Sequence, residues 1–437
     1  MLLISCARKG EEFKTCSPPD FNVLTRFLEY EKDPNKTIRV FSIGHKISLE
    51  TVESEEKFYN SMKNIVDAIK PCLSNRYNNL IVFEEHLGLI LGVFGSRGQT
   101  AREEKKKAED AMISVFSNYF LSSQYYTQKF PEISTFKARP LFLAITDSLW
   151  RPFFNTFSKL AKDSSSYIVS CQNVSEVEKV VDKEKVKTFV DDSVQTDFYY
   201  KALTSDVWNT CFVFSPSGEI VHKTKKVNLV PEEIEKLELS AGRYEWLDVY
   251  RIKGTEVDIC IGISLDAFIH EYVKFLDDKG CDVFLQPDAN SGKWAGKGGQ
   301  GYWQPDEWLD SVMGVLQSES YTHVSGKTIT TGYKNIVYNV NPMMTGNFFD
   351  IVFDGQSAIT SKKDSRLRQD LNYIGLKPIS ELGRFKEGGF LLLGPWVLSG
   401  GEDMRDQLEQ KSDRLAPGGS EENKYLQTIL AADLFIN

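Results

Sequence analysis

The alternation of short apolar strands with helical segments constrains the fold of this chain more than any other feature of its sequence. Apolar and β-branched residues dominate "TIRVFSIGH", "VDICIG" and "NIVYNV", which is typical of buried strands. Between the first strand and "NLIVFEEHLG", residues 54–73 place apolar side chains at helical spacing until Pro71. This order predicts a βαβ-like unit. Because so many strands are apolar on both faces, the sequence predicts an α/β fold with two sheets and helices outside them.

Length and composition exclude several classes of protein. The chain has 437 residues, 41% hydrophobic and 26% charged, which is enough for one large core with appendages. The formal net charge is −9 and no basic patch stands out, which argues against nucleic acid as a partner. No run approaches the roughly 18 apolar residues that span a bilayer, so we expect no embedded membrane segment.

The two ends of the chain and one internal segment interrupt the alternation. Breaker residues predict an N-terminal extension over residues 1–37, and residues 38–360 form the predicted domain. The segment from about 88 to 150 is long, irregular and rich in Phe and Tyr, which predicts a helical lid over a pocket or an oligomer surface. Residues 361–437 are predicted to be a C-terminal extension.

The cysteines and the N-terminus bear on location. Seven cysteines are scattered without the spacing of a metal site or a disulfide framework. We therefore expect reduced thiols and a cytoplasmic protein, with Cys260 as a small core residue. The start "MLLISC" resembles the tail of a bacterial lipoprotein signal, with Leu3 three residues before Cys6. A lipoprotein or secreted form is therefore the alternative.

Three apolar strands each end in a residue that can carry chemistry. Glu85 follows "NLIVF", Lys226 follows the predicted hairpin "VWNTCFVFSPSGEIVHKTK", and Ser264 follows "VDICIGI". Alone, each residue is more often solvated or structural. Together they supply a base, a cation and a nucleophile, the parts needed to attack an amide or nitrile carbon.

These segments resemble signatures of the nitrilase superfamily of carbon–nitrogen hydrolases, which use a glutamate, a lysine and a cysteine on an α-β-β-α sandwich. Glu85 matches the catalytic glutamate, with Glu84 where proline is usual. Lys226 matches the lysine, and Glu233 the second glutamate that follows it, with Asn228 where histidine is common. The resemblance implies a single large domain of the same four-layer architecture.

The nucleophile signature of that family ends in an acid two residues after the cysteine. Here Ser264 stands at the cysteine position and Asp266 at the acid. The segments "QPDAN" with Trp294, "NPMMTG" and "DGQS" are similar to later family segments, so the resemblance runs from about residue 37 to about 360. It implies substrate-binding roles for Asp266, Asn290 and Trp294. It also implies a small amide or nitrile-like substrate, a homodimer or higher homo-oligomer, and no cofactor or metal.

The replacement of cysteine by serine leaves three interpretations open. A thiol of pKa about 8.5 suits an unaided carboxylate base, whereas a serine hydroxyl is far less acidic. Ser264 is therefore expected to acylate slowly. It is an engineered replacement that traps substrate, a natural variant with slow or altered chemistry, or the mark of a pseudoenzyme that keeps the pocket as a ligand- or partner-binding module.

Neither the two glycine-rich stretches nor the histidines predict a nucleotide- or metal-binding site. Gly400 and Gly401 are predicted to form a plain turn, and "GKGGQG" at 296–301 a flexible loop at a pocket rim. The five histidines lack metal-ligand spacing, so no metal is expected.

Overall fold

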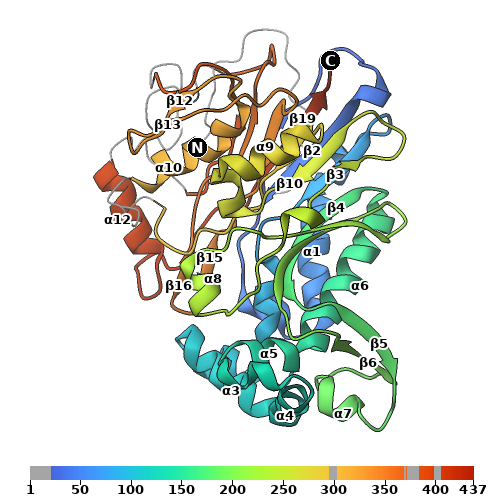
Figure 1. Cartoon of the computed structure of the whole chain (residues 1–437). Helices are drawn as coiled ribbons and strands as arrows, with labels where there is room; N and C mark the ends of the chain where they lie inside the picture. The colour runs from blue at the N-terminus through green and yellow to red at the C-terminus, as the bar shows by residue number, and fades with distance from the viewer. Residues whose placement is uncertain (1–20, 295–302, 369–370, 372–382, 398–404) are drawn as a thin grey trace.

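Two β-sheets pack face to face between helices in a computed structural model of the chain, which describes residues 21–294, 303–368, 371, 383–397 and 405–437 (Figure 1). The seven-stranded sheet consists, in spatial order, of β1 (Asn22–Arg26), β19 (Thr428–Phe435), β2 (Thr37–Gly44), β3 (Asn78–Val82), β4 (Tyr167–Val174), β7 (Trp208–Phe214) and β8 (Ile220–Lys225). The six-stranded sheet consists of β18 (Gly389–Leu393), β17 (Ala358–Ser361), β14 (Tyr338–Asn341), β11 (Val283–Leu285), β10 (Asp258–Ile261) and β9 (Tyr250–Arg251).

The apolar interior lies between the two sheets. Val40 and Leu80 from the first sheet meet Ile259, Val283 and Val340 from the second, and all five are fully buried or nearly so. Successive residues of a strand point to opposite faces, so alternate residues of the same strands face the outer helices. The central strands β2–β3–β4 and β10–β11–β14 pair in parallel, which requires both of their faces to be covered.

Helices cover both outer faces, which confirms the predicted four-layer α-β-β-α architecture as a single large domain (Figure 1). Helices α1 (Glu55–Ile69) and α6 (Thr146–Ser164) lie on the first sheet, and α9 (His270–Asp278) and α10 (Gln304–Val312) on the second. Helix α1 begins where the Ser54 hydroxyl accepts from the backbone N–H of Lys57 at 3.1 Å. The shorter helices are α7 (Val186–Phe189), α8 (Pro231–Glu235) and α12 (Arg405–Leu415).

The internal segment 88–150 is helical. It consists of the 3-10 turns η4 (Leu87–Val93) and η5 (Pro131–Thr135) and the helices α2 (Gln99–Glu104), α3 (Ala108–Asn118), α4 (Phe120–Lys129) and α5 (Arg139–Ala144). Figure 1 shows α3, α4 and α5 together at the end of the sandwich where α8 lies. Glu238, just beyond α8, accepts from the backbone N–H groups of Lys137, Ala138 and Arg139 at the start of α5. The segment is therefore fixed to the same end of the molecule as α8, and its role as a lid or oligomer surface stays a prediction.

Both chain ends contribute strands to the sheets instead of forming separate extensions. Strand β19 pairs with β2 from Thr428↔Gly44 to Phe435↔Thr37, and β1 pairs with β19 in parallel. Strand β18 pairs with β17 at the edge of the second sheet. The predicted boundaries at residues 38 and 360 therefore do not delimit the fold, because described residues on either side of them complete both sheets.

The expectation of reduced thiols is wrong for the cysteines that the structure pairs. Cys171 and Cys211 form a disulfide between β4 and β7, and Cys260 and Cys281 form one between β10 and the residues before β11. Cys72 is also disulfide-bonded. Cys260 lies in the core as predicted, at 0% exposure. Sequence spacing could not predict these pairs, because the registers of neighbouring strands bring them together.

The described residues also form three two-stranded pairs. The pairs are β5 (Val177–Val181) with β6 (Phe198–Ala202), β12 (Tyr321–Thr322) with β13 (Thr328–Ile329), and β15 (Gly346–Phe348) with β16 (Ile351–Phe353).

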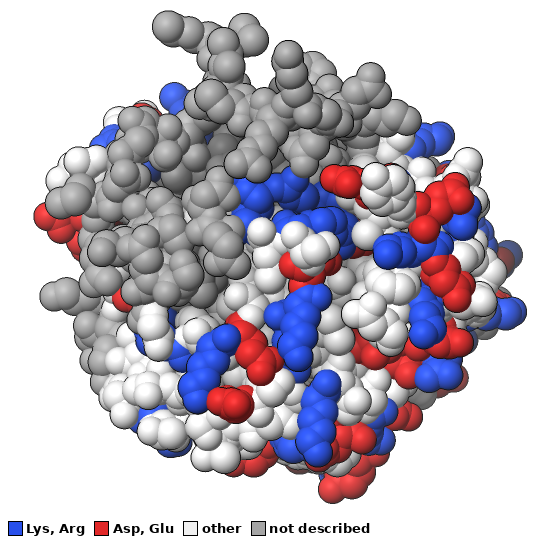
Figure 2. All heavy atoms as spheres, turned by 90° about the horizontal axis from the view of Figure 1, so that it is seen from above, with Lys and Arg blue, Asp and Glu red and all other residues white. Residues whose placement is uncertain are grey.

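Figure 2 shows basic and acidic side chains interspersed on the described part of one face. Among the described residues, no helix has the length and apolar character needed to cross a membrane. The segment "MLLISC", the loop 296–301 and the turn at Gly400 and Gly401 lie outside the described residues.

Candidate active site

Glu85 lies just beyond the end of β3, where the chain leaves the sheet. Its side chain is 1% exposed, and His86 after it has a left-handed backbone with φ of 56°. A non-glycine residue keeps this conformation only where its surroundings enforce it. Glu84 enters different surroundings, because its Oε1 lies 3.1 Å from Nδ1 of buried His45. The two consecutive glutamates therefore have separate partners.

Lys226 directly follows β8, the second strand of the predicted hairpin. Its backbone N–H donates to the carbonyl of Asn209 on β7 at 2.9 Å, which fixes where the side chain starts. Its ammonium Nζ lies 2.7 Å from Glu85 Oε1 and 2.8 Å from Glu233 Oε2. Burial alone would lower the pKa of Lys226, but the two carboxylates outweigh burial and hold the pKa above its ordinary value. Lys226 is therefore a buried, charged ammonium.

Glu233 comes from the first turn of α8. Its Oε2 accepts from the backbone N–H of Val230 at 3.0 Å, so the carboxylate also closes the start of that short helix. Burial would raise the pKa of Glu233, but His86 and Lys226 together hold the pKa well below its usual range. Glu233 is thus ionised and, like Glu85, contacts the Lys226 ammonium.

Two further residues join this cluster. The Asn209 amide donates to Glu85 Oε1 at 2.7 Å and to Glu233 Oε1 at 3.1 Å. The His86 Nε2 lies 3.6 Å from Glu85 Oε1 and 3.5 Å from Glu233 Oε1. Burial lowers the pKa of His86, but Glu85 and Glu233 reverse the effect and raise it. The sequence reasoning missed His86 as a site residue, although its position directly after Glu85 was an available signal.

A metal ion is not needed to balance these carboxylates. Glu85, His86 and Glu233 each offer a ligand atom within 4.8 Å of the others. However, the Lys226 ammonium already lies within hydrogen-bonding distance of both carboxylates. A cation of the protein itself therefore lies within hydrogen-bonding distance of both acids.

Ser264 lies at the start of the 3-10 turn η7 (Ser264–Phe268), which follows β10. Its φ is 49°, so it shares the uncommon left-handed backbone of His86. Its backbone N–H donates to the carbonyl of Pro287 at 3.1 Å. The residue is half-buried. A reactive side chain on a sharp, fixed turn after a strand is a suitable position for a nucleophile.

Asp266 connects this turn to the segment after Lys226. Its carboxylate accepts from the backbone N–H groups of Ile263, Val227 and Asn228 at 3.3, 3.4 and 2.8 Å, and from the Asn228 amide at 2.8 Å. Burial raises the pKa of Asp266 to about 7, although the hydrogen bonds from Asn228 and the charge of Lys226 oppose the rise. The structure thus gives Asp266 a positioning role, and its predicted contact with substrate stays a prediction.

Asp288 is a buried carboxylate beside the serine that the sequence reasoning did not select. It is 5% exposed and follows β11 within "QPDAN". Burial and the neighbouring charge of Glu85 raise the pKa of Asp288 to about 6, while a hydrogen bond with the Ser264 side chain, the charge of Lys226 and the amide of Gln286 oppose the rise. A titratable residue at the exit of a strand next to the nucleophile strand was the signal that could have identified it.

The other two predicted substrate-binding residues have partners of their own. The Asn290 amide donates to the carbonyl of Gly292 at 3.1 Å, and its oxygen accepts from Gln304. The Trp294 ring packs edge-on against Trp308, with centroids 5.1 Å apart. Among the described contacts none joins either side chain to the carboxylates of the site, so their substrate-binding roles stay predictions.

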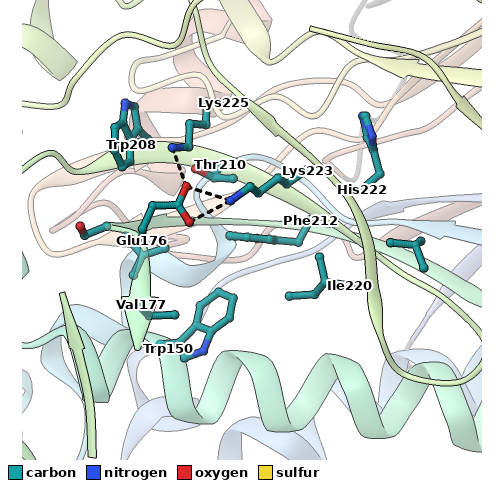
Figure 3. Close-up of a pocket in the computed structure, with 13 residues that line it drawn as sticks. Trp150, Glu176, Val177, Trp208, Thr210, Phe212, Ile220, His222, Lys223 and Lys225 are labelled. Carbon is teal, nitrogen blue, oxygen red and sulfur yellow. Dashed lines mark hydrogen bonds and ion pairs between the residues drawn. The ribbon is translucent and has the colours of Figure 1, made fainter. Parts of the chain in front are cut away.

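A separate cavity of about 380 Å³ lies on the outer face of β7 and β8 (Figure 3). Figure 3 shows Glu176 between two lysines, and its carboxylate lies 2.8 Å from Lys223 Nζ and 2.7 Å from Lys225 Nζ. The wall of this cavity includes Thr210 on β7. The neighbouring residue Asn209 contacts Glu85, and successive residues of a strand point to opposite faces, so Thr210 points away from Glu85. This cavity is therefore not the place where the reactive groups meet.

Comparisons with known proteins give similarity of fold at low identity. No family model matches the sequence, and no curated protein matches it. Among solved structures, the carbon–nitrogen hydrolase from Helicobacter pylori G27 is 12% identical over 75% of this chain and 83% of that chain, with a TM-score of 0.45. An amidase from Nesterenkonia sp. is 13% identical over 75% and 83%, with a TM-score of 0.41.

A cysteine-to-serine mutant of the amidase from Nesterenkonia AN1, which belongs to the nitrilase superfamily, is also similar. It is 14% identical over 74% of this chain and 83% of that chain, with a TM-score of 0.38. Structural similarity at this sequence identity and TM-score does not show which reaction a chain catalyses.

Proposed function

We propose that this chain belongs to the nitrilase superfamily and hydrolyses a non-peptide carbon–nitrogen bond, an amide, in a small molecule, with Ser264 at the position of the family's cysteine. The observation that carries the proposal is the contact of one buried ammonium with two buried carboxylates. Lys226 Nζ lies 2.7 Å from Glu85 and 2.8 Å from Glu233. These are three of the polar groups that the sequence signatures single out, with Ser264 and Asp266 as the others.

The geometry supports a distinct role for each group. An ammonium has three N–H donors, and two of those of Lys226 point at carboxylates, so one is left for the negative charge that develops on the attacked oxygen or nitrogen. Glu85 can accept a proton from the attacking hydroxyl or water and later donate it to the leaving group. Glu233 keeps Lys226 charged and oriented. The Ser264 oxygen forms an ester with the acyl group, and water then releases the acid.

A binding module is the second candidate, and the serine itself favours it. A hydroxyl gives up its proton far less readily than a thiol, so the same cluster would acylate Ser264 more slowly than a cysteine. In that case the pocket would hold a ligand without turnover.

Release of ammonia or amine from a panel of amides, nitriles and N-carbamoyl compounds tests the proposal. Ser264→Cys is expected to raise hydrolysis by at least about 100-fold, the scale of an activated nucleophile and its acid–base partner. Glu85→Gln or Lys226→Ala in that background is expected to abolish it. Lys223→Ala is the matched control, because Lys223 is an exposed lysine on the same hairpin. An inert Ser264→Cys protein that still binds a small ligand would favour the binding module.

The proposal extends to assembly and location. The family resemblance implies a homodimer or higher homo-oligomer, which sedimentation of the purified protein would test. The disulfides Cys171–Cys211 and Cys260–Cys281, and the disulfide-bonded Cys72, favour an oxidising compartment, and with it the secreted or lipoprotein alternative over the cytoplasmic one. Mass spectrometry of the protein taken from its native cells, alkylated before and after reduction, would show whether these cysteines are paired.

A further inference from the structure

We propose that Asp288, in place of Glu85, is the catalytic group that takes the proton of Ser264 and passes it to the leaving nitrogen, while Glu85 activates the water that attacks the ester. This inference rests on the proposed function, because it assigns a role within the same site. It is carried by the way three consecutive residues after β11 connect the serine to Glu85.

Pro287, Asp288 and Ala289 lie between the nucleophile and Glu85. The carbonyl of Pro287 accepts from the backbone N–H of Ser264 at 3.1 Å, and the N–H of Ala289 donates to Glu85 Oε2 at 3.2 Å. The Asp288 side chain, between these two contacts in the chain, lies close enough to Ser264 for the serine side chain to oppose the rise of its pKa. One short segment therefore contacts the backbone of the serine through a carbonyl and Glu85 through an amide, and places a carboxylate beside the serine.

The backbone of Asp288 is held on both sides. Its N–H donates to the carbonyl of Pro342 at 3.0 Å, and its carbonyl accepts from the N–H of Met344 at 3.0 Å. A carboxylate on a fixed backbone keeps its distance to the serine, which general-base catalysis requires. The position of Asp288 is thus set by the sheet and not by a mobile loop.

Glu85 has less capacity to accept the serine proton than Asp288. Glu85 Oε1 already accepts from Lys226 at 2.7 Å and from Asn209 at 2.7 Å, and its Oε2 from Ala289 at 3.2 Å. The Asp288 carboxylate accepts a long hydrogen bond from the Gln286 amide, at 3.4 Å. Burial raises the pKa of Asp288 to about 6, and the neighbouring charge of Glu85 adds to the rise. A base that titrates near neutral pH is better suited to a hydroxyl.

The step balances without a further reactant. The O–H bond of Ser264 breaks as its oxygen bonds to the amide carbon, and the proton passes to Asp288. Asp288 then gives this proton to the leaving nitrogen as the carbon–nitrogen bond breaks, which leaves an ester on Ser264, a free amine and an ionised Asp288. In the second half, water attacks the ester, Glu85 takes its proton, and the proton returns to the Ser264 oxygen.

The test is the rate at which a fluorophosphonate modifies Ser264, followed by mass spectrometry of the peptide. In this reaction the serine oxygen bonds to phosphorus, fluoride leaves and the proton goes to the base, so the readout does not depend on knowing the substrate. Asp288→Asn keeps the shape of the side chain and is expected to slow labelling by about 100-fold or more. Ser264→Ala is the blank, and unfolding in urea verifies that each variant is folded.

Two further measurements separate a base from a structural residue. The labelling rate of the wild type is expected to rise with pH through about 6 and then level off, and this rise should disappear in Asp288→Asn. The groups that face Asp288 are Glu85 after β3, Lys226 after β8, Ser264 in η7 and the neutral Gln286. Because Lys226 stays charged, the inflection near 6 is attributed to Asp288, and its loss in the variant verifies this.

The second measurement uses the thiol, which needs little help to ionise. In the serine protein, Asp288→Asn slows labelling by a certain factor. In the Ser264→Cys background, the same substitution should slow amide hydrolysis by a factor at least about tenfold smaller. An equal cost in both backgrounds, or unchanged labelling of Asp288→Asn, would overturn the inference. A wild-type Ser264 that resists labelling beside an active Ser264→Cys amidase would overturn it too, and would leave the proposed function standing. Inactivity of both forms would reject the proposed function instead.

Discussion

The two sides of the candidate site are held together by different interactions. On the acid–base side, Glu85, Lys226 and Glu233 are at most 2% exposed and are joined by charged side-chain contacts. On the nucleophile side, Ser264 is half-buried and is placed by the hydrogen bond of its own backbone to Pro287. A buried ion cluster tolerates no missing partner, whereas a side chain placed through its backbone can be exchanged. Evolution or design can therefore change the nucleophile with little effect on the charges.

Removal of the central cation should have the largest effect. Lys226→Met leaves Glu85 and Glu233 buried without their shared ammonium, and breaking a buried ion pair in this way costs about 3–5 kcal/mol. We expect the free energy of unfolding in urea to fall by that amount and activity of the Ser264→Cys form to disappear.

Lys223→Met is the matched control for this loss. The side chains of Lys223 and Glu176 are 45% and 37% exposed, and exposed pairs contribute at most about 1 kcal/mol. If both methionine variants lost the same small amount of stability, the charges of the acid–base side would not be the interactions that hold it.

Loss of the disulfide in the second sheet should act mainly on the nucleophile side. Cys260 and Cys281 are separated by 21 residues and connect β10, which leads to Ser264, with β11, which leads to Asp288. Replacing both by alanine should lower the free energy of unfolding by about 3 kcal/mol, the value for a loop of this length. Hydrogen exchange is expected to accelerate in residues 258–268 and 283–289 more than around Lys226. Equal acceleration at both places would show that the two sides are one cooperative unit.

The sequence was sufficient to predict the sandwich, and it singled out Glu85, Lys226 and Glu233, which the structure brings together. Each belongs to a local signature at the end of an apolar strand, so spacing along the chain was enough. His86 directly follows Glu85, and Asp288 follows a strand exit, so each had a local signal. Which charged groups of other strands come near them is not encoded in that signal. The strands at the chain ends were missed for the same reason, since β19 acquires its partner β2 from the opposite end of the chain.

Asp266 connects the two sides, and its replacement should have the smallest effect. It accepts from Val227 and Asn228 beyond Lys226 and from Ile263 before Ser264. Asp266→Asn keeps the shape but loses acceptor capacity, so we expect a loss of about 1–3 kcal/mol.

The pH dependence of that loss distinguishes Asp266 from an ordinary surface acid. Burial raises the pKa of Asp266 to about 7 from the ordinary 3.8. Between these values the unfolded chain has released the proton and the folded chain keeps it, so rising pH favours unfolding of the wild type. Asparagine has no proton to release, and the stability advantage of the wild type over Asp266→Asn should therefore shrink between pH 5 and pH 8. Urea midpoints of both proteins at several pH values measure it.

Asp163→Asn is the control for this titration. Asp163 is half-exposed, and its hydrogen bond with Lys159 lowers its pKa, so both its folded and unfolded forms are ionised throughout this range. Its stability difference from the wild type should stay constant from pH 5 to pH 8. A gap for Asp266→Asn that is equally constant, or that widens with pH, would mean that Asp266 is ionised in the folded protein. The contact between the two sides would then be a charged one, and the nucleophile side would depend on a buried charge just as the acid–base side does.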